Sequence, residues 1–296
     1  MPLSRGVVRA GIVLLLLAAG LPAGIATASA QSLSAAPASD QSDPFRLRGE
    51  LTQGGWAIGT APPGTTDLNL DGASIPVERD GNFLIAFDRD AGPQAQLVAM
   101  DPNGRRVTKT LAIAPRAWQI SRLNRLPRFP VPQPEFVRLR QPELEQIAAA
   151  RAQTTGAEGW RQHFVWPVTG RISTRFGSQR IYAGEPGAYH SGVDVARPTG
   201  TPIVAPADGV VILATTAPFT LEGRLLMIDH GAGLNSAFMH LSRIDVRVGD
   251  RVRQGQTIGA IGATGRATGP HLHWGMKWRD ARIDPLLFAG AMPAAN

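Results

Sequence analysis

Four of the six histidines in this 296-residue chain fall in three short motifs of its C-terminal half. The motifs are His190-Ser191-Gly192-Val193-Asp194, His271-Leu272-His273, and His240 near the end of an apolar run. Glycine and valine within the first motif make a helix unfavourable there. In a strand, side chains two or four positions apart point to the same face, so each motif can present its polar groups together.

Imidazoles and one carboxylate at this spacing suit a catalytic zinc site. Such a site takes three nitrogen or oxygen ligands and keeps a fourth position for water, whose pKa falls to near 7. Two further histidines beside the metal could serve as general base and as donor to a developing oxyanion. Each motif alone also fits a surface pair or a buried, hydrogen-bonded histidine. Their occurrence in one predicted β domain favours a shared site, whereas His163 and His230 are expected to be structural.

Residues 1–30 have the order of parts of a secretory signal peptide, which is a basic start, an apolar run and a small-x-small end. These parts are Arg5 and Arg9, the run from Ala10 to Ala19, and Ala28-Ser29-Ala30. The run is shorter than the ~20 residues that span a membrane, so we predict cleavage after Ala30 and no stable membrane span afterwards. The chain has no cysteine, which excludes disulfides, thiolate ligands and an N-terminal lipid on cysteine. We expect a periplasmic or extracellular protein that is not a lipoprotein.

The composition fits a folded protein, with 43% hydrophobic and 18% charged residues. A formal charge of +7 would suit nucleic acid, anionic lipid or an acidic wall polymer. The chain has no motif of interleaved aromatic and basic residues, and export argues against nucleic acid as a partner.

The predicted fold is mainly β, with a signal peptide (1–30), a flexible linker (31–44) and three further parts. Residues 45–115 contain short strand patterns between turn clusters, which predict a small immunoglobulin-like β-sandwich. This module has no catalytic cluster, so we expect a spacer or a docking module for a cell-envelope protein. Residues 116–162 form a Pro-rich linker and a connecting helix, expected from about Pro142 and broken near residues 154–156. Residues 163–292 return to Val- and Ile-rich strands with glycine at the turns.

The last part resembles the lysostaphin-type (LytM-like) family of zinc metalloendopeptidases that act on peptidoglycan. The resemblance covers about residues 163–288. It rests on WPVTGRISTRFG, HSGVDVARPTGTPIVAPADGVV, IDHGAGLNSAFMHLS, VGDRVRQGQTIGAIGATGRATGPHLHWGM and a closing DP. It implies a twisted antiparallel β barrel-sandwich with the metal on the floor of a groove that takes an extended peptide.

The resemblance also implies the role of each site residue. His190, Asp194 and His273 would bind one Zn²⁺ per catalytic domain, and His271 would be the general base. His240 would stabilise the tetrahedral intermediate, although Met239 replaces the small residue that commonly precedes it. Tyr182 and Tyr189 are candidates for a tyrosine that assists some members. The implied substrate is a cross-linking or stem peptide of peptidoglycan, and the bond cut stays open.

Two other classes of protein share parts of this pattern. A catalytically silent relative would activate another cell-wall hydrolase, but such relatives usually lack one or more ligands. A lipoyl- or biotinyl-type carrier is suggested by VRVGDRVRQGQTIGAI, but it needs a lysine at a hairpin tip, which the nearby hairpins lack. A further hypothesis is that the helix over about 142–162 covers the groove and inhibits the enzyme.

Overall fold

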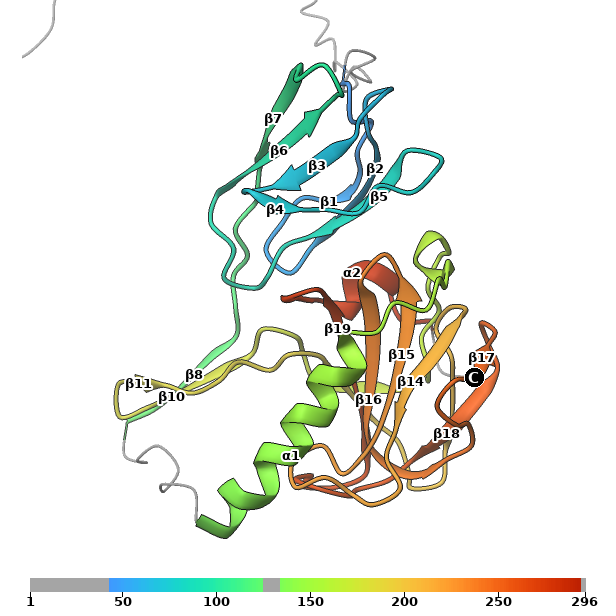
Figure 1. Ribbon diagram of the computed structural model, residues 1–296. Helices are drawn as coiled ribbons and strands as arrows, with labels where there is room; N and C mark the ends of the chain where they lie inside the picture. Colours follow the sequence, from blue (N-terminus) through green and yellow to red (C-terminus); the bar gives the residue numbers. More distant parts are fainter. Residues whose placement is uncertain (1–42, 125–133, 294–296) are drawn as a thin grey trace, which may run out of the picture. The chain divides into compact units, whose positions relative to one another are not determined.

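The computed structural model describes residues 43–124 and 134–293 (Figure 1). The predicted signal peptide and most of the predicted linker 31–44 therefore lie outside the described residues. No helix within the described ranges is both long enough and apolar enough to cross a membrane. Strands dominate those ranges, which confirms the mainly β prediction.

Residues 48–112 form two antiparallel sheets. One contains β1 (Arg48–Glu50), β2 (Trp56–Thr60) and β5 (Asn82–Ala86); the other contains β4 (Ala73–Ser74), β3 (Asp67–Leu70), β6 (Gln94–Met100) and β7 (Arg106–Ala112). Buried apolar side chains from both sheets, such as Phe83 and Leu97, belong to one core cluster. Two sheets around shared apolar residues agree with the predicted sandwich.

The linker region adds a strand and a helix. β8 (Ile120–Leu123) pairs in parallel with β10 (Gln179–Tyr182), which pairs with β11 (Glu185–Pro186). α1 spans Pro134–Arg151, so the helix begins before the predicted start at Pro142, which lies inside it. A proline within a helix removes one backbone hydrogen bond, and good helix formers on both sides sustain the turns. The expected break follows Arg151, before the short 3₁₀ helix η1 (Gly159–Arg161).

The C-terminal region is built on one ten-stranded sheet. Its main path runs β17-β14-β15-β16-β19-β12-β9, with β13, β18 and β20 paired off it. The bounds are β9 (Arg171–Thr174), β12 (Val193–Ala196), β13 (Pro202–Val204), β14 (Gly209–Ala214), β15 (Arg224–Gly231), β16 (Leu234–Ile244), β17 (Arg251–Val252), β18 (Thr257–Ile261), β19 (His271–Trp278) and β20 (Ala281–Ile283). Within the described ranges the sheet stays open between β17 and β9, without the closure that a barrel requires. A short helix, α2 (Pro285–Ala289), follows it and is N-capped by Asp284.

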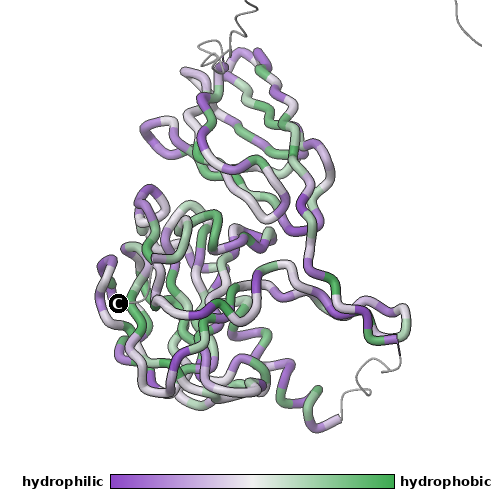
Figure 2. Tube along the Cα trace, turned by 180° about the vertical axis from the view of Figure 1, so that it is seen from behind, coloured by the Kyte–Doolittle hydropathy of each residue, from purple (hydrophilic) through white to green (hydrophobic). Residues whose placement is uncertain are grey.

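The two faces of this sheet bury different residues. Phe238, Leu272 and Trp274 are fully buried in the larger core cluster. On the other face, Met227 and Ala237 form a smaller cluster with residues of α1, so this helix covers part of that face. Figure 2 colours the chain by residue hydropathy and shows hydrophobic and hydrophilic stretches in both β regions.

Candidate metal centre

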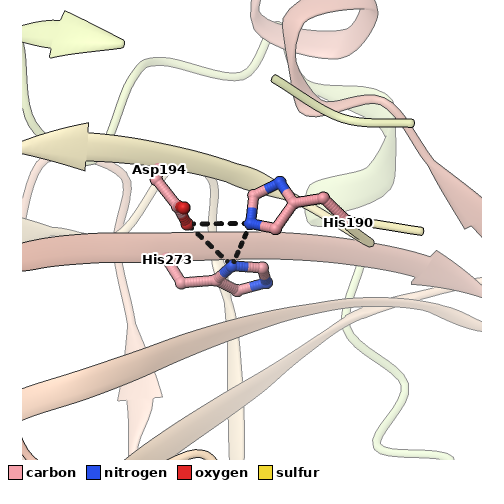
Figure 3. A group of neighbouring side chains, drawn as sticks. All are labelled: His190, Asp194 and His273. Atoms are coloured by element: carbon pink, nitrogen blue, oxygen red, sulfur yellow. Dashed lines mark hydrogen bonds and ion pairs between the residues drawn. The ribbon is translucent and has the colours of Figure 1, made fainter. Parts of the chain in front are cut away.

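Three predicted ligand side chains converge at one point (Figure 3). His190 Nε2 lies 3.0 Å from Asp194 Oδ1, His273 Nδ1 lies 2.9 Å from the same oxygen, and the two nitrogens are 3.0 Å apart. Within the described residues, this is the one group of histidine and acidic side chains spaced to hold a metal ion. Residues 83 positions apart in the chain thus meet at one centre.

Neighbouring strands position two of these ligands. β12 and β19 are antiparallel, and Asp194 lies directly opposite His273. Opposed side chains share a face of the sheet at short range. His190 differs from the prediction, because β12 begins only at Val193 and the first motif is not one strand. Instead, hydrogen bonds from His190 N to Ser178 O and from Gly177 N to His190 O hold its backbone.

Gly192 is a site residue that the ligand pattern alone did not identify. A Cβ added there would lie 2.4 Å from Trp274 O and 2.7 Å from His273 Nε2. Both distances are far below van der Waals contact, so only glycine lets this backbone pass beside the His273 ring. The glycine of the first motif is therefore required by close approach, whatever its local dihedral angles.

Backbone carbonyls fix the tautomers of three histidines. The Nδ1 atoms of His190, His240 and His271 lie 3.2, 2.9 and 2.8 Å from the carbonyl oxygens of Arg175, Thr264 and Gly269. A carbonyl only accepts, so Nδ1 carries the proton in the neutral rings and Nε2 keeps its lone pair. His273 is turned the other way, with Nδ1 in the cluster and Nε2 buried without a partner among the described residues.

The cluster suits a cation better than a set of hydrogen bonds. His190 Nε2 has no proton to donate in its neutral form, so this nitrogen and Asp194 Oδ1 face each other with lone pairs. Two imidazole nitrogens and one carboxylate oxygen are a zinc ligand set. Burial opposes ionisation of Asp194, but the His190 and His273 rings beside its carboxylate outweigh burial and hold its pKa well below the ordinary value. Burial lowers the pKa of His273, so Asp194 and His273 fit a metal as a carboxylate and a neutral imidazole.

A β-bulge brings His240 to the same face as the ligands. Arg224 and Leu226 of β15 pair with Leu241 and Phe238, so β16 has one extra residue at this point. His240 has a φ of 64°, in the left-handed region. Phe238 and Leu241 both remain in the core on the opposite face, and Met239 and His240 share the site face. Bulges of this kind change the direction in which side chains point. The strict alternation of a regular strand therefore does not predict the position of His240.

His271 and His240 lie beside the three ligands. His271 Nε2 is 3.8 Å from Asp194 Oδ1, and the His240 ring centroid is 4.7 Å from that of His271. Burial lowers the pKa of His240 to about 4. The neutral ring therefore presents a lone pair at Nε2, and this nitrogen donates a hydrogen bond only after it takes up a proton.

The remaining histidines and tyrosines lie in other settings. His230 is fully buried, with Nδ1 2.8 Å from Asp208 O and Nε2 2.9 Å from Ser236 Oγ, as expected of a structural histidine. His163 is exposed. The Tyr189 hydroxyl donates to Asp88 Oδ1 at 2.8 Å, and burial raises the pKa of this tyrosine to about 12. The hydroxyl is thus engaged by an acidic residue outside the cluster.

The chain is thus a β protein with a candidate metal centre, in which Asp194 and His273 of an open antiparallel sheet meet His190 from the segment before β12. The sequence profile of peptidase family M23 matches residues 188–285, which include all five predicted site residues. A crystal structure from Pseudomonas aeruginosa assigned to peptidase M23 is 30% identical, with a TM-score of 0.64. The alignment covers 82% of this chain and 96% of that one. The chain therefore belongs to peptidase family M23.

Curated relatives match part of this chain. Peptidoglycan DD-endopeptidase ShyA of Vibrio cholerae is 42% identical over 105 residues, which are 35% of this chain and 24% of that protein. Cell division protein DipM of Caulobacter vibrioides is 32% identical over 133 residues, which are 45% of this chain and 21% of that protein. The matched segment thus spans about a quarter of the length of these relatives.

Proposed function

We propose that the protein is a zinc-dependent endopeptidase that hydrolyses cross-linking or stem peptides of bacterial peptidoglycan. The observation that carries this proposal is the meeting of His190 Nε2, Asp194 Oδ1 and His273 Nδ1 within 3.0 Å, with two further histidines beside them. Membership of a peptidase family and a relative named for peptidoglycan DD-endopeptidase activity support the reaction and the substrate. The predicted export would place the protein where this polymer is available.

Each of the five side chains at the site would have its own chemical role. His190, Asp194 and His273 would hold Zn²⁺, which when bound supplies a Lewis acid for the scissile carbonyl and an acidified water. His271 has its Nε2 lone pair on the site side, because Gly269 O holds the Nδ1 proton; it can therefore accept the proton of the attacking water. His240, held by Thr264 O, can stabilise the oxyanion once its Nε2 is protonated.

Metal analysis and digestion of cell walls test the proposal together. The purified chain should contain one zinc per molecule and release peptide fragments from purified peptidoglycan, identified by mass spectrometry. His271→Ala should keep the zinc and lose about 10²-fold or more in rate, because a general base is removed without a ligand. Bound zinc without any cleavage would instead support the alternative, a silent relative that activates another hydrolase. A chain that binds no zinc would contradict the proposal.

The N-terminal parts have separate proposed roles. The two-sheet module would dock to a cell-envelope protein, and the signal peptide would deliver the chain to the periplasm or the exterior. Mass spectrometry of the mature N-terminus should find Gln31 as the first residue. A chain that keeps residues 1–30 would contradict cleavage.

A further inference from the structure

A hollow continues from the metal centre along the site face of the sheet. Its lining includes Arg151, Ser191, Asn235, Gly275, Lys277 and Arg282. The register of β16 and β19 places Met239 opposite His273, Ala237 opposite Gly275, and Asn235 opposite Lys277. His273, Gly275 and Lys277 share a face because they are two positions apart. The hollow is therefore the next stretch of the surface that holds the metal ligands.

Small residues keep the floor of this hollow low. Gly275 has no side chain between His273 and Lys277, and Ala237 lies across from it. A Cβ at Gly275 would make only ordinary contacts, at 3.4 Å from Ser191 O and 3.5 Å from His273 Nε2. The absence of a side chain at Gly275 is thus not forced by crowding, and it leaves room for a ligand.

Three cationic side chains line the hollow from three elements. Arg151 comes from the end of α1, Lys277 from β19 and Arg282 from β20. Lys277 pairs at 3.3 Å with Asp280, whose side chain is fully exposed, and Arg282 donates to the Tyr189 hydroxyl at 3.2 Å. Arg151 Nε is buried and has no hydrogen-bond partner among the described residues. Burial and the nearby Arg282 charge both lower the pKa of Arg151, as expected where positive charge is incompletely neutralised.

Arg151 is held in place by the packing of its helix. Ile147 and Ala150 pack with Met227 and Ala237 of the sheet. Further along α1, Glu143 accepts hydrogen bonds from Thr220 N and Oγ1, both at 2.6 Å. The guanidinium therefore lies at the hollow as part of a fixed wall.

An acceptor in the hollow complements the cations. Asn235 is 5% exposed, and its Oδ1 has no partner among the described residues. A buried acceptor of this kind calls for an N–H group from a ligand. Cationic donors for an oxyanion and one acceptor for an N–H together match the acidic part of a peptide, in which a carboxylate lies close to an amide N–H.

We propose that this hollow is a subsite for a free carboxylate of the peptide substrate, held by Arg151 with Lys277 and Arg282. The inference rests on the proposed peptidase function. Gly275 lies two residues beyond His273, about 7 Å away at the rise of a strand. An extended substrate advances by a similar step, so the carboxylate belongs to a residue about two positions from the scissile bond.

Matched peptides test the subsite. A defined cross-linked stem peptide would be prepared with its side-chain and terminal carboxyl groups free, or converted to carboxamides. The wild-type chain should show a KM about 10- to 100-fold lower for the free acid, the range expected for a hydrogen bond to a charged group. The kcat should change little, because an interaction remote from the reacting bond acts on ground and transition states alike.

Two variants and a control assign the effect to the hollow. Arg151→Met keeps an unbranched side chain of similar helix propensity, removes the guanidinium, and should remove most of the preference for the acid. Lys277→Met should reduce it. Arg138→Met is the matched control, because it removes the same charge from the same helix at a side chain that is 70% exposed. This control should keep the full preference.

Binding measurements separate this inference from the proposed function. Calorimetric titration of both peptides into the zinc-loaded His271→Ala chain reads the subsite without turnover. Selective binding of the acid that Arg151→Met abolishes supports the subsite even if the wild type cuts neither peptide, a result that would count against the peptidase proposal alone. Equal KM and equal binding for acid and carboxamide, or a preference that survives in Arg151→Met, would overturn the subsite.

Discussion

At the scale of single residues, the candidate centre depends on which atom of each imidazole is free. Three histidines donate hydrogen bonds from Nδ1 to backbone carbonyls, while His273 turns Nδ1 toward the other candidate ligands. The backbone beside His273 must come close for that orientation, which is the role of Gly192. An alanine at residue 192 would therefore change the metal site by steric contact and not by charge.

Gly192→Ala should weaken zinc binding more than it weakens the fold. The new methyl group would collide with Trp274 O and His273 Nε2, so the His273 ring must move from its position beside Asp194. We expect zinc affinity to fall about 10- to 100-fold, as for the loss of other groups that orient a ligand. Competition with a zinc chelator measures it. Gly92→Ala, where a Cβ meets nothing within 4 Å, is the control, and equal zinc affinities in the two variants would refute this steric account.

The sequence pointed to three candidate ligand side chains that do meet in the structure, because the motifs that contain them are short. Two imidazoles and a carboxylate at even spacing already imply a shared face. His190 was placed wrongly within a strand, since the hydrogen bonds that hold it come from residues 177 and 178, outside the motif. Gly192 and Arg151 were missed for the same reason: their neighbours at the site are distant in the chain.

At the scale of elements, two features decide what surrounds the centre. The bulge in β16 places Met239 and His240 on one face, and α1 packs on that face beside the hollow. The amino-acid pattern predicted most strands of the chain, because their alternation is visible in the sequence. It could not predict the bulge, the parallel pairing of β8 with β10, or a helix that continues through Pro142, because each depends on contacts between separate segments.

Glu143→Ala should loosen α1 on the sheet. Glu143 is 8% exposed and accepts from Thr220 N and Oγ1, so its removal leaves partly buried donors without an acceptor. The cost should be about 1–3 kcal/mol, seen as faster amide hydrogen exchange within α1. The neighbouring Glu145→Ala is the control, because Glu145 is exposed on the same helix. Unchanged exchange in Glu143→Ala would show that apolar packing alone fixes the helix.

The hypothesis that α1 inhibits the enzyme stays a prediction. Its position on the site face agrees with a cover over part of that face, but Arg151 at its end would also supply a group for substrate. The two roles predict different results when the helix is removed. A cover predicts faster cleavage of every peptide after removal, whereas a wall of the subsite predicts weaker binding of acidic peptides in particular.

At the scale of the whole molecule, stability should depend on pH through a buried histidine. His230 joins Asp208 O to Ser236 Oγ, and Ser236 Oγ also accepts from Trp274 Nε1. Burial lowers the pKa of His230 to about 4, from an ordinary value of 6.5. Between pH 4 and pH 6.5, His230 takes up a proton more readily in the unfolded chain than in the folded chain. The stabilisation is thus complete above pH 6.5 and is lost as the pH falls toward about 4.

His230→Gln should make the fold less stable but less sensitive to acid. One proton taken up on unfolding costs about 1.4 kcal/mol per pH unit. Between pH 7.5 and 5, His230 alone should therefore account for about 2 kcal/mol of lost stability. Urea unfolding at both pH values, with zinc removed by chelator, measures the difference between wild type and variant. The same pH dependence in both chains would show that other groups carry the acid sensitivity.

The bulge has a consequence for how such proteins can diverge. Deletion of the single codon for Met239 would restore regular alternation in β16 and shift His240 by one strand position, about 3.4 Å. His190, Asp194 and His273 come from other segments and would be left intact. If the proposed mechanism holds, a lineage could thus lose cleavage in one mutational step while His190, Asp194 and His273 all remain in the sequence.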